Sequence, residues 1–418
     1  MVLRLLHTAD WHLGASLHGH DRFDEHAAFL RWLLDQLDEQ AIDALIVAGD
    51  VLDKIVSPAS AYQQLYDFLA AALERRPALD VVIVAGNHDP ASRLEAPAAM
   101  LRKLSRVHVV GTYDEHELGK LVVPLHDATG RVAARVVAMP FLRATDRWPG
   151  ESTTDCLRRI YDAAFAVARR ELAADGVGDR AAGHALVAVG HCHLQGGRIS
   201  EGSERGILRG GEEAVPSSVF PDDVAYVALG HLHLAQHVGD PRIRYSGSPI
   251  PLAMSERDYE HSVTLVELDG ARLLSTRLLR VPRTVPFVSI TASLAELPSA
   301  LRALPAHGAE VAPFLELVVP VEGPTPSLRR DVERLLERYA ARLVRVHPRS
   351  EHDDPLTSEP TRRRLDQLTP GEVFARLHEA KHGNPPSEAL SHAFDDLLDG
   401  VRELERDASV ELAKEAVR

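Results

Sequence analysis

An aspartate and a histidine end the first apolar segment of the chain, in the sequence LLHTADWHLG (residues 5–14). Asp10 and His12 are side chains that a protein core rejects unless a partner satisfies them. Residues two apart on an extended strand point to the same side, so these two could hold one metal ion. Taken alone, Asp-x-His also fits an aspartate that caps the next turn and a histidine on the surface. The rest of the chain has to decide between these interpretations.

Four further apolar runs end in the same way, at GD (49–50), GNHD (86–89), GHCH (190–193) and GHLH (230–233). Each run is typical of a short buried strand, and ligands bind at the carboxyl ends of such strands. Each glycine is expected to let the backbone turn sharply beneath the next residue. We therefore expect seven metal ligands to meet: Asp10, His12, Asp50, Asn87, His191, His231 and His233.

The types of these ligands indicate the chemistry. Carboxylates, an amide oxygen and imidazoles, with no thiolate, suit Mn²⁺ and Fe²⁺, and suit Zn²⁺ less well. Seven ligands exceed the need of one ion, whereas two ions that share a carboxylate use them all. Such a pair clamps a phosphate and activates a water molecule, so the expected reaction is the hydrolysis of a phosphoester.

The elements that must position these residues belong to an α/β fold. Apolar runs alternate with amphipathic segments over the first 140 residues, which predicts parallel strands joined by helices. Later strand candidates, with fewer helices among them, are expected to form a second, more antiparallel sheet. The prediction for residues 1–281 is a sandwich of two sheets with helices outside. The expected first-sheet elements are strands at 43–48 and 80–85 and helices at 23–40, 60–75 and 95–104.

Two smaller parts follow the sandwich. Prolines in RVPRTVPF (280–287) mark a boundary, and alternating strands and helices then predict a small α/β domain over 282–350. The polar stretch 348–360 is typical of a linker, and residues 351–418 are expected to form helices. Their apolar stripe either packs back on this chain or docks a partner. It consists of Leu390, Phe394, Leu397, Leu398, Val401 and Leu404.

Composition restricts the function further. The formal net charge of −14 over 418 residues argues against a protein that coats nucleic acid by bulk electrostatics. Twelve arginines against seven acidic residues lie between 271 and 350, either as a solvated surface or as a segment that contacts phosphates. Cys156 and Cys192 form no CxxC motif. No apolar run is long enough to cross a membrane and the N-terminus lacks a signal-peptide pattern, so we expect a cytoplasmic protein.

The ordered series Asp-x-His, Gly-Asp, Gly-Asn-His-Asp, Gly-His and Gly-His-x-His resembles the signature of the calcineurin-like metallophosphoesterases. Narrower motifs are similar to the SbcD-type DNA repair nuclease subunits of that superfamily, over residues 1–285. They are TADWHLG, GDVLDK, GNHD, VALGHLHLAQ and YSGSPIPL (245–252). Beyond 285 the resemblance is one of architecture, a small capping domain followed by a C-terminal helical tail.

The resemblance implies a role for each site residue. Asp50 would bridge two divalent ions, with Mn²⁺ expected, and the Gly-His element favours His191 over His193 as a ligand. His88 would be the catalytic histidine, which stabilises the developing charge or protonates the leaving 3′ oxygen. Asp53 would face the site, either in a catalytic role or as a carboxylate that orients a ligand. Asp10, His12, Asp50 and His233 would hold one ion, and Asp50, Asn87, His191 and His231 the other.

The resemblance also implies substrates and partners. It predicts a metal-dependent exonuclease and endonuclease that cuts double-stranded DNA ends and hairpins in repair, recombination and replication. An SbcC-like ATPase subunit would dock on the helices of 351–418, and catalytic-domain helices would form a homodimer. The alternatives are a small-molecule or cyclic-nucleotide phosphodiesterase, or a binding protein that has lost catalysis. Four apolar side chains could serve the dimer, but are expected to pack on the sheet: Tyr62, Leu65, Phe68 and Leu69.

Overall fold

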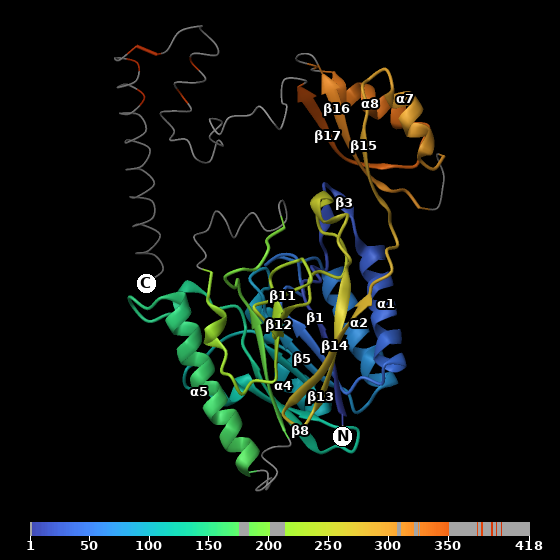
Figure 1. Cartoon of the computed structure of the whole chain (residues 1–418). Coiled ribbons are helices and arrows are strands. Elements are labelled where there is room, and N and C mark those ends of the chain that lie inside the picture. Colours follow the sequence, from blue (N-terminus) through green and yellow to red (C-terminus); the bar gives the residue numbers. More distant parts are fainter. Residues whose placement is uncertain are drawn as a thin grey trace. The chain divides into compact units, whose positions relative to one another are not determined.

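The structure is a computed structural model in which the chain forms two compact units (Figure 1). One unit comprises Met1–Val319 with Thr325–Pro348, and the other Pro320–Pro324 with Arg349–Arg418. Most of the helical tail predicted over 351–418 lies outside the described residues. The structure describes residues 2–174, 184–200, 214–306, 311–321, 325 and 327–350, and farther on Phe374, His378, Pro386, Ser387, Leu390 and Phe394.

The first sheet contains the strands that end in Asp10, Asp50 and Asn87. Four neighbouring strands run parallel, and two later strands add to one edge in antiparallel fashion. The hairpin of β13 and β14 therefore belongs to this sheet and not to the second one. In spatial order the strands are β14 (Arg272–Arg280), β13 (Ser262–Asp269), β1 (Val2–Thr8), β4 (Ala44–Ala48), β5 (Asp80–Val84) and β6 (Val107–Val110).

The second sheet is mainly parallel, so the expectation of a more antiparallel sheet was wrong. Its four central strands run parallel and only its edge strands are antiparallel. The parallel step from β8 to β9 requires a crossover, and an unpredicted helix, α5 (Thr153–Ala174), lies between them in sequence. In spatial order the strands are β11 (Gln236–Val238), β12 (Asp240–Tyr245), β10 (Tyr226–Gly230), β9 (Ala185–His191), β8 (Val132–Ala138) and β7 (Val122–His126).

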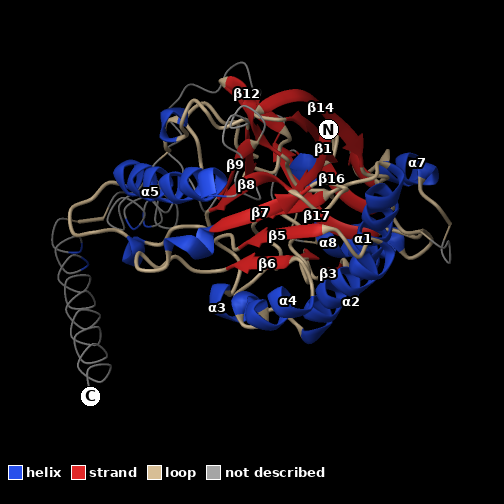
Figure 2. Cartoon of the chain, turned by 90° about the horizontal axis from the view of Figure 1, so that it is seen from below, coloured by secondary structure: helices blue, strands red, loops and turns tan. Residues whose placement is uncertain are grey.

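Helices lie outside the sheets on opposite sides (Figure 2). Successive side chains of β4 alternate between two cores: Ala44, Ile46 and Ala48 face the core shared with the second sheet and α5, whereas Leu45 and Val47 face helices. This α/β/β/α sandwich confirms the predicted fold class. Of the helix expected at 95–104, residues 98–104 form a helix, and Pro97 separates it from an earlier, unpredicted helix at 91–95. The helices of the first sheet are α1 (Phe23–Glu39), α2 (Ala59–Arg75), α3 (Ala91–Glu95) and α4 (Ala98–Leu104).

Three apolar side chains of α2 settle an alternative that the sequence left open. Leu65, Phe68 and Leu69 are buried in the core beneath the first sheet, and Tyr62 packs partly against it. The expectation that they pack on the sheet is confirmed. Among the described helices, none combines the length and apolar composition that a membrane crossing requires.

The small domain predicted after residue 281 contains a three-stranded sheet in the order β15-β16-β17. β15 and β16 run parallel. Its two α-helices are short, with four and nine residues. The elements are β15 (Phe287–Thr291), α7 (Leu297–Ala300), β16 (Phe314–Val321), α8 (Leu328–Leu336) and β17 (Arg342–Ser350).

A buried arginine connects this small domain to the two-sheet sandwich. Arg22 follows the short hairpin of β2 (Ser16–Leu17) and β3 (His20–Asp21). It donates to both carboxylate oxygens of Glu25, at 2.5 and 2.7 Å, and to the carbonyl oxygen of Pro251, at 2.6 Å. Its guanidinium also lies 5.6 and 5.3 Å from the ring centroids of Phe287 and Phe314. These contacts hold the loop that follows Pro249 in a fixed position.

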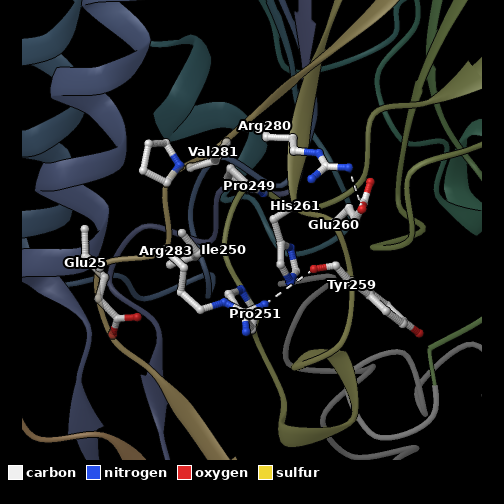
Figure 3. Close-up of a pocket in the computed structure, with 12 residues that line it drawn as sticks. Glu25, Pro249, Ile250, Pro251, Tyr259, Glu260, His261, Arg280, Val281 and Arg283 are labelled. Carbon is white, nitrogen blue, oxygen red and sulfur yellow. Dashed lines mark hydrogen bonds and ion pairs between the residues drawn. The ribbon is translucent and has the colours of Figure 1, made fainter.

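A cavity of about 330 Å³ lies along the segment that leads from β14 to the small domain (Figure 3). Its lining includes Pro251, Tyr259 and His261 from one loop, Arg280 from the end of β14 and Arg283 from the connecting segment. None of the predicted metal ligands or catalytic residues lines it. The residues predicted to bind metal and to act in catalysis therefore lie outside this cavity, at the ends of the strands.

Candidate metal centre

The ends of strands from both sheets bring all seven predicted ligands into one connected group. The backbone N–H of His231 donates to Asp10 Oδ1 at 2.9 Å, which joins β10 to the end of β1. The backbone N–H of His12 donates to the carbonyl oxygen of Asp50 at 2.9 Å. The group comprises Asp10, His12, Asp50 and Asn87 from the first sheet, and His191, His231 and His233 from the second.

Four of these residues have a left-handed backbone. The φ angles are 54° at Asp10, 48° at His12, 50° at Asp50 and 99° at His231. Residues other than glycine rarely adopt this conformation, and where they do, the surrounding structure must stabilise it. Such strained positions cluster at functional sites, and here four of them are predicted ligands.

A first group of possible ligand atoms comes from Asp10, His12 and His233, whose atoms lie within 4.8 Å of one another. The rings of His12 and His233 have their centroids 5.3 Å apart. Nε2 of His12 lies 3.5 Å from Asp50 Oδ2 and makes no hydrogen bond within the described part of the chain. A buried nitrogen directed at a carboxylate in this way is what a metal ligand requires.

A second group comes from Asp10, Asp50 and His191. Nε2 of His191 lies 3.4 Å from the same Oδ2 atom of Asp50 that faces His12. Oδ1 of Asn87 lies 3.0 Å from His191 Nε2 and 3.0 Å from His231 Nδ1. One oxygen of Asp50 therefore lies between two imidazoles, as expected of a carboxylate that bridges two ions.

The orientation of His191 fits a cation. Its Nδ1 faces the carbonyl oxygen of Ala48 at 2.8 Å, and because a carbonyl only accepts, Nδ1 carries the proton. Once Nε2 has lost its proton, its lone pair points toward the Asp50 carboxylate, an arrangement that a positive ion between them would stabilise. The residues present therefore fit a divalent metal centre, with Asp50 shared.

The electrostatics of the site favour a cation as well. Burial opposes a charge on His191, yet the carboxylate of Asp50 raises the pKa of this imidazole to about 9. Burial likewise opposes ionisation of Asp50, but His191 and His12 hold the pKa of its carboxyl well below the usual range. The carboxylates thus favour protons on the neighbouring imidazole rings. A metal ion bound between carboxylate and imidazole would take the place of such a proton.

The two residues predicted to be catalytic lie beside the first group. His88 is exposed, and its Nδ1 lies 2.8 Å from the carbonyl oxygen of Asp53. Its ring centroid is 4.8 Å from that of His12. Asp53 Oδ1 lies 3.4 Å from His12 Nδ1, on the side of the ring opposite Asp50. This position supports the interpretation in which Asp53 orients a ligand.

Asp89, the last residue of the GNHD motif, has a structural role. Its buried carboxylate accepts hydrogen bonds from the backbone N–H groups of Gly86, Leu52 and Val51, at 2.8, 2.8 and 3.2 Å. These bonds tie the loop after β5 to the loop after β4. Burial raises the pKa of this carboxyl to about 6, with the nearby Asp50 as a second cause.

The glycines before His191 and His231 do not form the sharp turns that the sequence predicted. Gly190 and Gly230 lie within β9 and β10, and neither has a positive φ. A Cβ atom on Gly230 would collide with the carbonyl oxygen of Ala48 in the facing sheet, and one on Gly190 would lie 2.6 Å from Tyr161 Oη. Close approach, rather than a turn, therefore requires glycine at both places.

His193 belongs to none of the possible metal groups found among the described residues, whereas His191 does. Cys192 between them is buried in the core. The structure thus brings His191, and not His193, to Asp50.

Two residues beside the ligands were not found from the sequence. Glu256 is fully buried, and its Oε1 lies 2.8 Å from Nδ1 of His233. The ring of Phe141 stacks on His231, with centroids 6.3 Å apart, and meets His191 edge-on at 6.2 Å. Neither Glu256 nor Phe141 lies in a sequence motif with a ligand, so only the folded structure shows that they contact the ligand histidines.

Comparison with known proteins agrees with this geometry. A family model described as calcineurin-like phosphoesterase matches residues 3–235, and the SbcD_C model, described as type 5 capsule protein repressor C-terminal domain, matches residues 283–382. A protein of Rhodobacter capsulatus, named as the SbcD component of the nuclease SbcCD, is 41% identical over 392 residues, which cover 89% of this chain and 94% of the relative. The chain belongs to the SbcD family of calcineurin-like phosphoesterases.

More distant SbcD family members match over nearly their whole length. The relative from Bacillus subtilis is 31% identical and the alignment covers 96% of this chain and 99% of that protein. The relative from Escherichia coli K12 is 29% identical, with 94% and 97% covered. Both are named as the same component of the nuclease SbcCD. The family expected from the motifs is confirmed, and the metal groups of the site agree with divalent metal use.

Proposed function

We propose that this SbcD family member is the nuclease subunit of an SbcCD-type complex and hydrolyses phosphodiester bonds of DNA at a two-metal centre. The observation that carries the proposal is the position of Asp50 Oδ2, 3.5 Å from His12 Nε2 and 3.4 Å from His191 Nε2. The names of the relatives supply the substrate class. Double-stranded ends and hairpins are the proposed DNA substrates, in repair, recombination and replication.

The metal pair would be Mn²⁺, which suits a centre of carboxylate, amide and imidazole ligands. In the proposed centre Asp10, His12, Asp50 and His233 hold one ion, and Asp50, Asn87, His191 and His231 the other. When bound, two such ions clamp the scissile phosphate and supply the nucleophile at neutral pH. The protein has to hold the ligands and move the proton of the leaving group.

His88 is the residue proposed to handle that proton. Its Nδ1–H is directed at the carbonyl oxygen of Asp53, so the proton that can be exchanged with substrate is the one at Nε2. The cationic ring would donate this proton to the leaving 3′ oxygen or stabilise the charge that develops there. Asp53 is proposed to act by orienting His12, through the 3.4 Å approach of Oδ1 to Nδ1.

The proposed partners are an SbcC-type ATPase, docked on residues 351–418, and a second copy of this chain. Three exposed apolar side chains, Tyr66 on α2 and Met100 and Leu104 on α4, are available for a homodimer. Residues 271–350, from β14 through β17, are proposed to contact DNA, supported by their excess of arginine over acidic residues. A cytoplasmic location is part of the proposal, because chromosomal DNA would be the substrate.

The test is cleavage of an end-labelled DNA duplex and a DNA hairpin by the purified full chain, with and without Mn²⁺. A small phosphodiester and the His88→Ala variant are measured beside it. We expect Mn²⁺-dependent DNA cleavage that His88→Ala lowers by roughly 10²-fold or more. Cleavage of the small ester alone, even with an SbcC-type ATPase and ATP added, would instead support a small-molecule phosphodiesterase.

A further inference from the structure

The two halves of the metal centre differ in what lies behind their imidazoles. In the first group Nδ1 of His233 is directed at the carboxylate of Glu256, at 2.8 Å, and Nδ1 of His12 at the carboxylate of Asp53, at 3.4 Å. In the second group Nδ1 of His191 is directed at the neutral carbonyl oxygen of Ala48, at 2.8 Å. An anion therefore backs both imidazoles of one group, and a neutral acceptor backs His191 in the other.

This difference has a known physical consequence. A carboxylate behind a metal-binding imidazole fixes the tautomer, holds the ring in place and makes the coordinating nitrogen more basic. Replacing such a carboxylate typically costs roughly 10–100-fold in metal affinity. A backbone carbonyl, such as that of Ala48 behind His191, fixes the tautomer but adds no negative charge.

Glu256 is itself held rigidly. Its side chain is fully buried, and its second oxygen, Oε2, accepts a hydrogen bond from the backbone N–H of Leu252 at 2.7 Å. The loop that carries it is fixed by the bond from Arg22 to the carbonyl oxygen of Pro251 and by Met254, which packs in the small apolar core. Because the Glu256 side chain is already fixed, it can hold His233 in one orientation without losing conformational entropy of its own when a metal binds.

We propose that Glu256 is a positioning residue for His233, and that it makes the Asp10–His12–His233 position the tighter of two unequal metal sites. The proposal rests on the proposed function for the presence of two ions. It adds a residue that no sequence motif included, and it assigns an order of affinity to the two positions.

The test is a calorimetric titration of Mn²⁺ into the metal-free full chain, with free Mn²⁺ followed by electron paramagnetic resonance. The native chain is expected to bind two ions with separable affinities. Glu256→Gln keeps the size and the acceptor for Leu252 but removes the charge, and should weaken the tighter event roughly 10–100-fold. The weaker event should stay within about twofold of native. Glu267→Gln, on β13 away from the centre, is the matched control and should change neither event.

The pattern across the two events separates positioning from a general structural effect. The proposal would be overturned if Glu256→Gln weakened both binding events equally or left the tighter event unchanged. Two equal affinities in the native chain would also overturn it. If Glu256→Gln does not fold, Glu256→Asp takes its place. Because Asp retains the charge, the loss of Mn²⁺ affinity should be smaller and confined to the tighter event. Loss of affinity in both events would again overturn the proposal. Two unequal sites with the expected Glu256→Gln effect, but no DNA cleavage, would support this proposal and refute the proposed nuclease. DNA cleavage with two equal sites would do the reverse.

Discussion

At the scale of single residues, Asp50 connects more of the site than any short motif indicates. Oδ1 accepts a hydrogen bond from the backbone N–H of His88, the residue proposed to be catalytic, at 2.9 Å, which ties the loop of His88 to Asp50. Oδ2 faces His12 and His191 from the two proposed metal positions. The same carboxylate therefore contacts the loop of the proposed general acid and lies between two possible ligand groups, and Asp50 has the left-handed backbone that clusters at functional sites.

A buried histidine gives a prediction for the pH dependence of stability. Burial, with the positive charge of Arg22 as the next cause, lowers the pKa of His26 to about 3. The unfolded chain binds this proton near pH 6.5 and the folded chain does not, so the free energy of unfolding falls as pH drops from 6.5 toward 3. At pH 5 this residue should account for about 2 kcal/mol of the loss.

Urea unfolding at pH 7 and pH 5 measures this effect. In His26→Leu the fall in the free energy of unfolding between these pH values should be smaller than in the native chain by about 2 kcal/mol. His116→Leu removes an exposed imidazole and is the control. If His26→Leu and the native chain lost equal stability on acidification, the neutral buried state of His26 would not be the cause.

At the scale of elements, the sequence predicted the strands that end in ligands because each is a short apolar run followed by a polar residue. It did not predict the crossover helix α5, whose apolar positions Cys156, Ile160 and Phe165 are interrupted by arginines in the sequence. It also could not place Glu256 behind His233, since the two are 23 positions apart and the path between them depends on the small domain. The local sequence pattern predicts the ligands, whereas the residues that hold the ligands in place are set by contacts between positions distant in the sequence.

The closeness of the two sheets gives a prediction at this scale. A Cβ atom at position 230 would lie 2.8 Å from Ala9 Cβ and 2.9 Å from His191 Nδ1, besides its collision with the carbonyl of Ala48. Gly230→Ala should therefore lower the free energy of unfolding by about 1–3 kcal/mol, because a close-packed interior resists an added methyl group. Urea unfolding at pH 7 measures the change.

A matched glycine provides the control for this substitution. Gly119 has no atom within 4 Å of the place that a Cβ would occupy, and Gly119→Ala should change stability by no more than about 0.5 kcal/mol. Similar losses in Gly119→Ala and Gly230→Ala would show that contact between the sheets is not what requires glycine at 230.

At the scale of the whole molecule, the chain combines a metal centre with a separate unit that includes Arg349–Arg418. Of that stretch the structure describes a few positions, among them Phe374 and Phe394, whose rings stack with centroids 4.2 Å apart. Leu390 is also described, whereas the remaining members of the apolar stripe predicted from the sequence lie outside the described residues. Two alternatives make different predictions for the stripe: it packs on this chain, or it docks a partner.

The double variant Leu397→Asp with Val401→Asp distinguishes the two alternatives, because the residues are four apart on the predicted stripe. If the stripe docks an SbcC-type ATPase, as proposed, the thermal midpoint of the chain should stay unchanged while affinity for that partner falls roughly tenfold or more. Calorimetric melting and a binding titration measure the two quantities, with Glu403→Ala, outside the stripe, as the control. A lower melting temperature with unchanged partner affinity would mean that the stripe packs on its own chain, since buried charge then destabilises the fold itself.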